Sequence, residues 1–220
     1  MQITLLFMAA IMACVIGWLL KQSLNTQPWV SDEVADQATG ASLELNPKAL
    51  ALGVFLAVAV SLFALFVSAY TLRMEEPDWI PVRDPDLLWV NTGFLVLASI
   101  AYHWTRNQAV SGKGEYLLTG LLVSGVLSVL FLFGQLATWQ QLQQAGYFVG
   151  SNPANAFFYL ITAVHAVHLL GGLYVWGRSV VRVWSGAEAD AVRLSIELCT
   201  IYWHFLLLVW VVLFGLLLAT

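Results

Sequence analysis

The sequence predicts an all-α membrane protein with six transmembrane helices, and three observations lead to this fold class. The chain of 220 residues is 60% hydrophobic and 10% charged, whereas a soluble domain carries about 25% charged residues. Six apolar stretches are each long enough to cross a bilayer, which takes about 20 residues per helix. Nearly all the charge falls in the short segments between these stretches.

The first three helices are bounded by charged residues. The six predicted helices cover roughly residues 3–20, 49–72, 87–104, 116–138, 156–176 and 194–219. The first ends at Lys21, the second at Arg73, and the third lies between Asp86 and Arg106. A cleaved signal peptide is an alternative for the first stretch. Signal peptides carry basic residues before the apolar core, but only Met1 and Gln2 precede this one, so we favour a retained helix.

The last three helices are bounded by turn and polar residues. The fourth follows the glycines around Lys113 and continues outward into a glutamine-rich end at 140–144. Asn152-Pro153 marks a turn and the start of the fifth helix. The sixth begins just after Arg193.

The distribution of lysine and arginine predicts the orientation in the membrane. The segments after the first, third and fifth helices hold seven of these residues, against two on the other side: Arg73 and Arg83. Because cytoplasmic loops are enriched in basic residues, the first side is expected to be cytoplasmic. Both termini are then expected in the periplasm.

Composition excludes several classes of function. No basic patch suggests nucleic-acid binding. Cys14 and Cys199 both lie inside apolar stretches, and no cysteine–histidine spacing typical of zinc sites is present. We find no nucleophile–base pair and no nucleotide-binding loop. Transporters tend to show internal repeats and broken helices, and neither is visible, which disfavours an independent transport protein.

A histidine pair lies inside the fifth apolar stretch. His165 and His168 are three residues apart and share one helix face, which Thr162 and Gly172 extend. Ionisable residues are costly in a bilayer and mark functional positions. One interpretation is a haem or metal ligand pair, with His204 and His103, which lies at the end of its helix, as further ligands. The interpretation we favour is hydrogen bonding between packed helices.

Glu197 and His204 lie two turns apart on the sixth helix, again on one face. A proton-relay role is one hypothesis, since chains of acidic residues and histidines line such paths. The simpler interpretation is a buried polar pair or a headgroup anchor, with Glu197 paired to Arg193 four residues earlier.

Four stretches together carry a family resemblance. They are Ser-Ala-Tyr at 68–70, Gly-Gln-Leu-Ala-Thr-Trp at 134–139, the whole of 157–173, and Glu197 followed by Tyr-Trp-His-Phe at 202–205 and Val-Trp at 209–210. The chain resembles subunit III of the haem–copper respiratory oxidases, the cytochrome c oxidase subunit 3 family. The resemblance covers residues 47–220 and implies a five-helix core whose two helix groups leave a phospholipid-holding cleft. Residues 1–46 would be an extra N-terminal transmembrane helix with a cytoplasmic segment.

Three departures from the family pattern stand out. A membrane-embedded glutamate usual in the family is replaced by Ala59 in the second helix. The aspartate that often follows the Tyr-Trp-His-Phe motif is absent, because leucines fill 206–208. The first helix has no counterpart in the common five-helix form.

The resemblance implies an accessory, non-redox subunit of a proton-pumping cytochrome c oxidase of the aa3/caa3 type, in a bacterial inner membrane. It implies no catalytic, cofactor-binding or metal-binding residue in this chain, since haem and copper belong to partner subunits I and II. The roles implied are stabilising subunit I, supporting proton uptake and binding phospholipid. The expected polar and aromatic residues of the lipid cleft are His165, His168, Glu197, Trp203 and His204. Alternatives are a related component of a quinol oxidase or nitric oxide reductase, and an independent haem-binding or transport protein.

Overall fold

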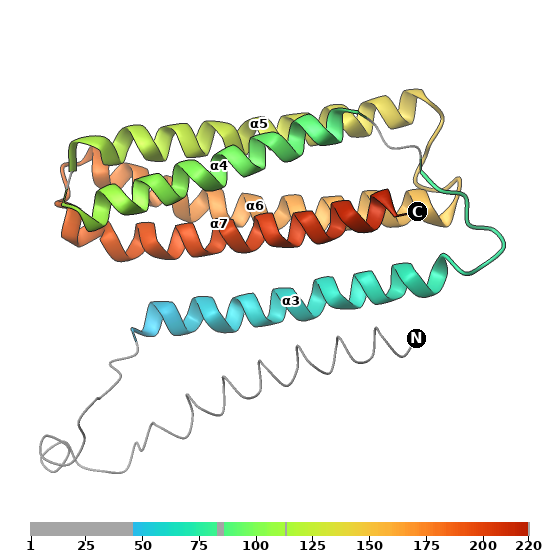
Figure 1. Cartoon of the computed structure of the whole chain (residues 1–220), viewed down its shortest axis with the longest axis horizontal. Coiled ribbons are helices and arrows are strands. Elements are labelled where there is room, and N and C mark those ends of the chain that lie inside the picture. The colour runs from blue at the N-terminus through green and yellow to red at the C-terminus, as the bar shows by residue number, and fades with distance from the viewer. Residues whose placement is uncertain (1–45, 83–85, 113, 220) are drawn as a thin grey trace, which may run out of the picture. The chain divides into compact units, whose positions relative to one another are not determined.

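The computed structural model describes residues 46–82, 86–112 and 114–219, and every element in them is a helix (Figure 1). In chain order these are α3 (Pro47–Arg73), α4 (Leu87–Val110), the short 3₁₀ helix η1 (Gly114–Tyr116), α5 (Leu117–Gln144), α6 (Pro153–Trp184) and α7 (Ala189–Leu218). Within the described residues, five helices are long and apolar enough to cross a membrane. The last five predicted helices are therefore confirmed, and the first, at 3–20, lies outside the described residues.

The helices run beyond the apolar stretches that predict them. The fifth apolar stretch predicts a helix end near Trp176, but α6 continues for two more turns to Trp184 and includes Arg178 and Arg182. Its 32 residues correspond to about 48 Å, whereas the hydrocarbon core is about 30 Å thick. Helices continue through the headgroup region because their backbone hydrogen bonds do not depend on an apolar environment.

The chain divides into two compact units, residues 1–64 and 65–220. The described part of the first unit consists almost entirely of the earlier part of α3, an apolar helix that includes Ala59. The second unit contains the end of α3 and the four helices α4–α7.

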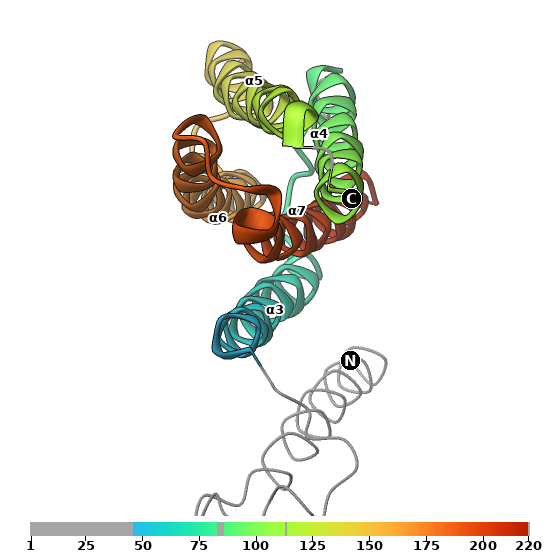
Figure 2. The same cartoon turned by 90° about the vertical axis from the view of Figure 1, so that its left-hand side faces the viewer.

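Helices α4–α7 form a four-helix bundle in which each helix packs mainly against two neighbours. The contacts run α4 to α5, α5 to α6, α6 to α7, and α7 back to α4, as the end-on view shows (Figure 2). The interior is filled by large side chains from all four helices that are fully buried: Leu95, Tyr102, Leu121, Phe131, Phe158, Leu169, Trp203, Leu206 and Trp210.

Glycines let these helices approach closely. A Cβ atom at Gly125 on α5 would collide with the indole of Trp176 on α6. A Cβ atom at Gly172 on α6 would likewise meet the rings of Tyr202 and Trp203 on α7. Small residues at such positions are typical of membrane bundles, where close packing replaces the hydrophobic effect between helices.

One end of the second unit is held by the segment between α3 and α4. The rings of Tyr70, Trp79 and Phe157 pack together, with Tyr70 and Trp79 4.8 Å apart between centroids. Asn152 Nδ2 donates to the carbonyl of Ile80 at 2.6 Å, and Asn152 Oδ1 accepts from the backbone N–H of Ala154. Asn152 is thus the N-cap of α6, with proline in its first turn, which confirms the predicted helix start.

An ion pair joins Arg73, the last residue of α3, to Asp78 on this segment. The two terminal guanidinium nitrogens of Arg73, Nη1 and Nη2, donate to the carboxylate of Asp78. The hydrogen bonds from Arg73 are the main cause that holds the pKa of Asp78 below its ordinary value.

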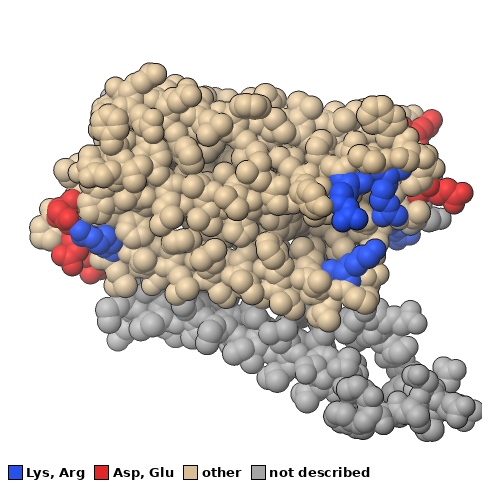
Figure 3. All heavy atoms as spheres, turned by 180° about the vertical axis from the view of Figure 1, so that it is seen from behind, with Lys and Arg blue, Asp and Glu red and all other residues tan. Residues whose placement is uncertain are grey.

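Charged side chains gather at the ends of the helices and leave an uncharged band between them on the face drawn in Figure 3. This banded surface is what a bilayer requires, because its core cannot hydrate charged groups. The described residues therefore form a multi-pass membrane protein.

Candidate functional site

His165 lies in the interior of the bundle and is 0% exposed. Its imidazole packs between Phe131 on α5 and Trp210 on α7, with ring centroids 5.9 Å and 5.1 Å away. Thr162 and Gly172 on the same helix face are also buried, so the predicted face is confirmed. This face of α6 points into the bundle.

His168 lies at the edge of that face and is half-buried. Its Nδ1 lies 2.8 Å from the carbonyl oxygen of Val164 in the same helix, so Nδ1–H donates to that carbonyl. The carbonyl of His168 in turn accepts a hydrogen bond from the hydroxyl of Tyr202 on α7, at 2.8 Å. The link between α6 and α7 at this point comes from the backbone of His168 and the tyrosine.

The segment 202–205 attaches α7 to the rest of the bundle. Trp203 is 0% exposed, and its indole Nε1–H donates to Ser128 Oγ on α5 at 2.8 Å. The Trp203 ring also packs against Tyr102 on α4, with centroids 4.4 Å apart. Tyr202 and Trp203 together contact Gly172 on α6. These two side chains thus bind α7 to all three other helices.

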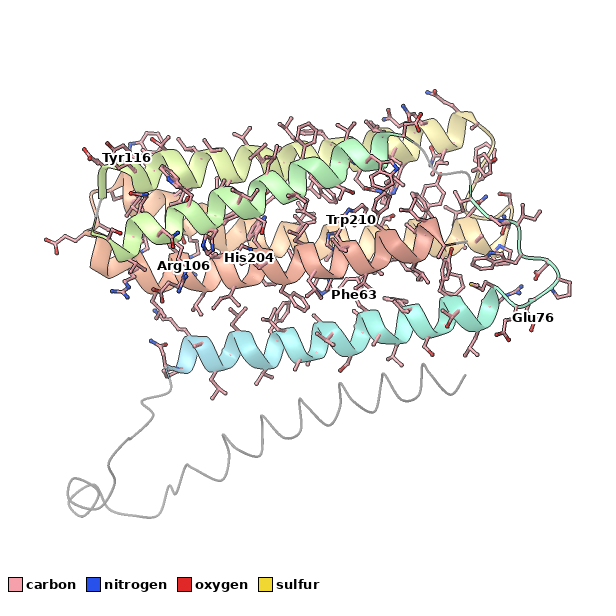
Figure 4. All side chains as sticks on the ribbon, viewed as in Figure 1. Phe63, Glu76, Arg106, Tyr116, His204 and Trp210 are labelled. Carbon is pink, nitrogen blue, oxygen red and sulfur yellow. The ribbon has the colours of Figure 1, made fainter. Side chains whose placement is uncertain are left out.

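His204 points the other way, to the outer side of the contact between α4 and α7, and is exposed. Its Nδ1 forms a short hydrogen bond with Ser99 Oγ on α4. Its Nε2 lies 3.5 Å from Nδ1 of His103, also on α4, and the two rings stack. Figure 4 shows His204 and Arg106 close together on these neighbouring helices.

Glu197 is paired with Arg193, as predicted, at 3.1 Å between Oε1 and Nε. The Glu197 side chain is 25% exposed and that of Arg193 is 47% exposed. Both lie toward the start of α7, the end that the charge distribution predicts to be cytoplasmic.

The five predicted site residues therefore fall into two groups. His165 and Trp203 are enclosed in the bundle, while His168, Glu197 and His204 are partly or well exposed. Among the residues that the structure describes, no group of three or more histidine, cysteine, aspartate or glutamate residues could hold a metal ion.

The partners of His204 are not evident from the sequence. In the sequence, His103 is only a further candidate ligand at a helix end, and Ser99 is one of several small polar residues in the third predicted helix. Their position depends on the antiparallel register of α4 and α7, which also pairs Thr200 with Tyr102 and Trp210 with Thr92. The sequence shows that each helix carries hydroxyl and imidazole groups, but it does not show which residue of α4 lies beside which residue of α7.

Comparisons with known proteins identify the family of the chain. The family model described as "Cytochrome c oxidase subunit III" matches residues 3–218, further than the region 47–220 on which the sequence resemblance rests. Cytochrome c oxidase subunit 3 of Synechocystis sp. is 25% identical over 166 residues, 73% of this chain and 70% of the relative. The probable cytochrome c oxidase subunit 3 of Mycobacterium bovis is also 25% identical over 166 residues, 73% of this chain and 82% of the relative. The Mycosarcoma maydis subunit 3 is 26% identical over 200 residues, 84% of this chain and 72% of the relative. With the helical bundle and the buried Tyr202–Trp203 contacts in place, the chain belongs to the cytochrome c oxidase subunit III family.

Proposed function

We propose that this chain is the accessory, non-redox subunit of a proton-pumping cytochrome c oxidase of the aa3/caa3 type. The observation that carries the proposal is the family match over residues 3–218, supported by relatives that are named as subunit 3 of cytochrome c oxidase. Its partners would be subunit I, as the main contact, and subunit II. These two partner subunits would hold the haems and coppers. Its roles would be to stabilise subunit I and to sustain proton uptake at the cytoplasmic side.

Phospholipid binding is the second part of the proposal. His168, Glu197 and His204 are the candidates for lining a lipid cleft, because each has a partly or well exposed side chain. His165 and Trp203 would act from inside the bundle, by fixing the positions of α6 and α7. A carboxylate paired with Arg193 near the start of α7 is suited to a phospholipid headgroup level, where charged groups remain hydrated.

The proposed location is a bacterial cytoplasmic membrane, with both termini in the periplasm. The supporting observation is the excess of lysine and arginine in the segments after the first, third and fifth predicted helices. We also propose residues 1–46 as an extra N-terminal transmembrane helix and cytoplasmic segment, and 47–220 as the five-helix domain.

Purification through an affinity tag on this chain, in mild detergent, tests the function. We expect a haem–copper subunit I in the eluate, with the haem absorption of the complex, and oxidation of cytochrome c. An eluate without subunit I would overturn the proposal. Activity with a quinol in place of cytochrome c would show that the complex is a quinol oxidase. A Soret band from the separated chain alone would favour a haem-binding protein instead.

A further inference from the structure

Two carboxamide side chains are buried inside the bundle. Asn91 on α4 is 0% exposed and Gln135 on α5 is 2% exposed. Both polar atoms of each side chain have no hydrogen-bond partner among the residues that the structure describes. An unpaired buried amide is costly even in a soluble protein, and hydrocarbon around the bundle offers no alternative partner.

The two amides lie at the same height in the bundle. The amide of Asn91 occupies the space beside Gly134, where a Cβ atom would collide with it. Gly134 immediately precedes Gln135, whose side chain belongs to the buried face of α5. Because Gly134 and Gln135 are adjacent in α5, Asn91 and Gln135 lie at nearly the same position along the bundle, one on each of two helices in close contact.

Helices α6 and α7 contribute to the same layer. Trp210 on α7 donates from Nε1 to Oγ1 of Thr92, the neighbour of Asn91, at 2.9 Å. The same indole packs against His165 on α6 and against Phe131, one turn before Gln135 on α5. Figure 4 shows Trp210 between the ribbons of the bundle. Neighbours of both amides therefore take part in a buried layer to which all four helices contribute.

Water is the ligand that fits these groups. Two carboxamides offer two carbonyl acceptors and two NH₂ donors. A buried water molecule needs two to four polar partners, and it can accept and donate at once. We propose that Asn91 and Gln135 bind at least one water molecule inside the bundle, at the level of Trp210, and that this bound water joins α4 to α5. The inference goes beyond the accessory role, because it does not depend on which oxidase the chain serves.

Cryo-electron microscopy of the unmodified complex in lipid nanodiscs, at a resolution that shows ordered water, tests the site directly. We expect a density peak within hydrogen-bond distance of both amide side chains. Direct contact between the two amides, with no peak beside them, would overturn the proposal. A chain that purifies without oxidase subunits would overturn the proposed function, while the same density could still be measured in the chain alone.

Substitutions then test what the water stabilises. Asn91→Leu or Gln135→Met should each lower the apparent melting temperature of the purified complex by about 3–6 °C, because the remaining amide loses part of its hydration. The double variant should lose less than the sum of the two, since no polar group is then left buried. The matched controls are Asn107→Leu on α4 and Gln143→Met on α5, which make the same chemical changes at exposed positions.

These controls should leave the melting temperature unchanged. Strictly additive losses at Asn91 and Gln135 would contradict a shared water site. A density peak that persists in both single variants would also contradict it. The density measurement on the unmodified complex needs no substitution and decides the matter if a variant fails to assemble.

Discussion

His165 and His204 occupy opposite environments in one bundle, although both lie in apolar helices. His165 is enclosed by Phe131 and Trp210 and has no exposed surface. His204 lies on the outer side of α7, bonded to Ser99 and stacked on His103. A histidine in a membrane helix can thus belong to the packing of the interior or to a surface that lipid or another subunit reaches. Three substitutions test this division, and a fourth tests the ion pair between Arg73 and Asp78.

The largest effect is expected from filling the interior. In Gly172→Leu the new side chain would collide with Tyr202 and Trp203, and such overpacking costs about 3 kcal/mol. We expect a sharp fall in the yield of assembled complex and in its melting temperature. Gly171→Leu is the matched control, because nothing lies within 4 Å of a Cβ atom at Gly171. Equal losses in both variants would mean that the interior face of α6 is assigned wrongly.

Trp203→Phe should have the next largest effect. It removes the hydrogen bond to Ser128 and part of a fully buried ring, and we expect a loss of about 1–3 kcal/mol. Thermal unfolding of the complex measures it. Trp184→Phe is the control, since Trp184 is 78% exposed and should change stability by less than about 0.5 kcal/mol. An unchanged melting temperature for Trp203→Phe would show that this tryptophan does not stabilise the core.

His204→Ala should affect function more than stability. Because the side chain is exposed, we expect a loss of less than about 1 kcal/mol, with normal haem spectra in the complex. If His204 serves proton uptake or lipid binding, activity should decay faster during sustained turnover while the initial rate is kept. The measurement is oxygen consumption over many turnovers. A changed haem spectrum would contradict an accessory role. An unchanged decay of activity during turnover would show that His204 does not serve the proposed cleft.

Asp78→Asn should have the smallest effect, because its ion pair with Arg73 lies in water. The folded pKa of Asp78 is below the ordinary value of 3.8. The pair therefore contributes fully above about pH 4, and its contribution disappears as the pH falls through the folded pKa. Protease cleavage of the 74–86 segment should become slightly faster in the variant at pH 7, and salt should reduce the difference. A difference that persists at high salt would point to contacts other than this ion pair.

The helices could be predicted well from the sequence because membrane crossing leaves a strong signal. An uninterrupted run of about 20 apolar residues is typical of a membrane-spanning helix, and Asn152-Pro153 predicts the start of α6 to the residue. The Arg193–Glu197 pair is predictable too, since it depends only on the spacing along one helix. The glutamine-rich continuation predicted for the fourth helix agrees with the end of α5 at Gln144. The predicted end of α6 comes too early, because polar residues at headgroup level continue a helix without an apolar signal.

Contacts between helices could not be predicted from the sequence in the same way. The choice between interior and surface for His165 and His204 depends on how each helix is rotated. Both α6 and α7 carry large apolar residues on their exposed sides as well as on their buried sides, so the apolar pattern does not mark the interior face. The bond from Trp203 to Ser128 and the layer around Asn91 and Gln135 join residues far apart in the chain. Only the packed structure supplies the antiparallel registers that bring them together.

The tryptophans of the bundle have a practical consequence. Among the described residues, four indole N–H groups donate to a neighbouring helix: Trp139 to Thr162, Trp176 to Leu121, Trp203 to Ser128 and Trp210 to Thr92. Separation of α5, α6 or α7 from its neighbours breaks at least one of these bonds and changes the polarity around an indole. The intrinsic fluorescence of the chain is therefore a label-free optical signal for the assembly of the bundle, provided that it is recorded apart from the quenching haems.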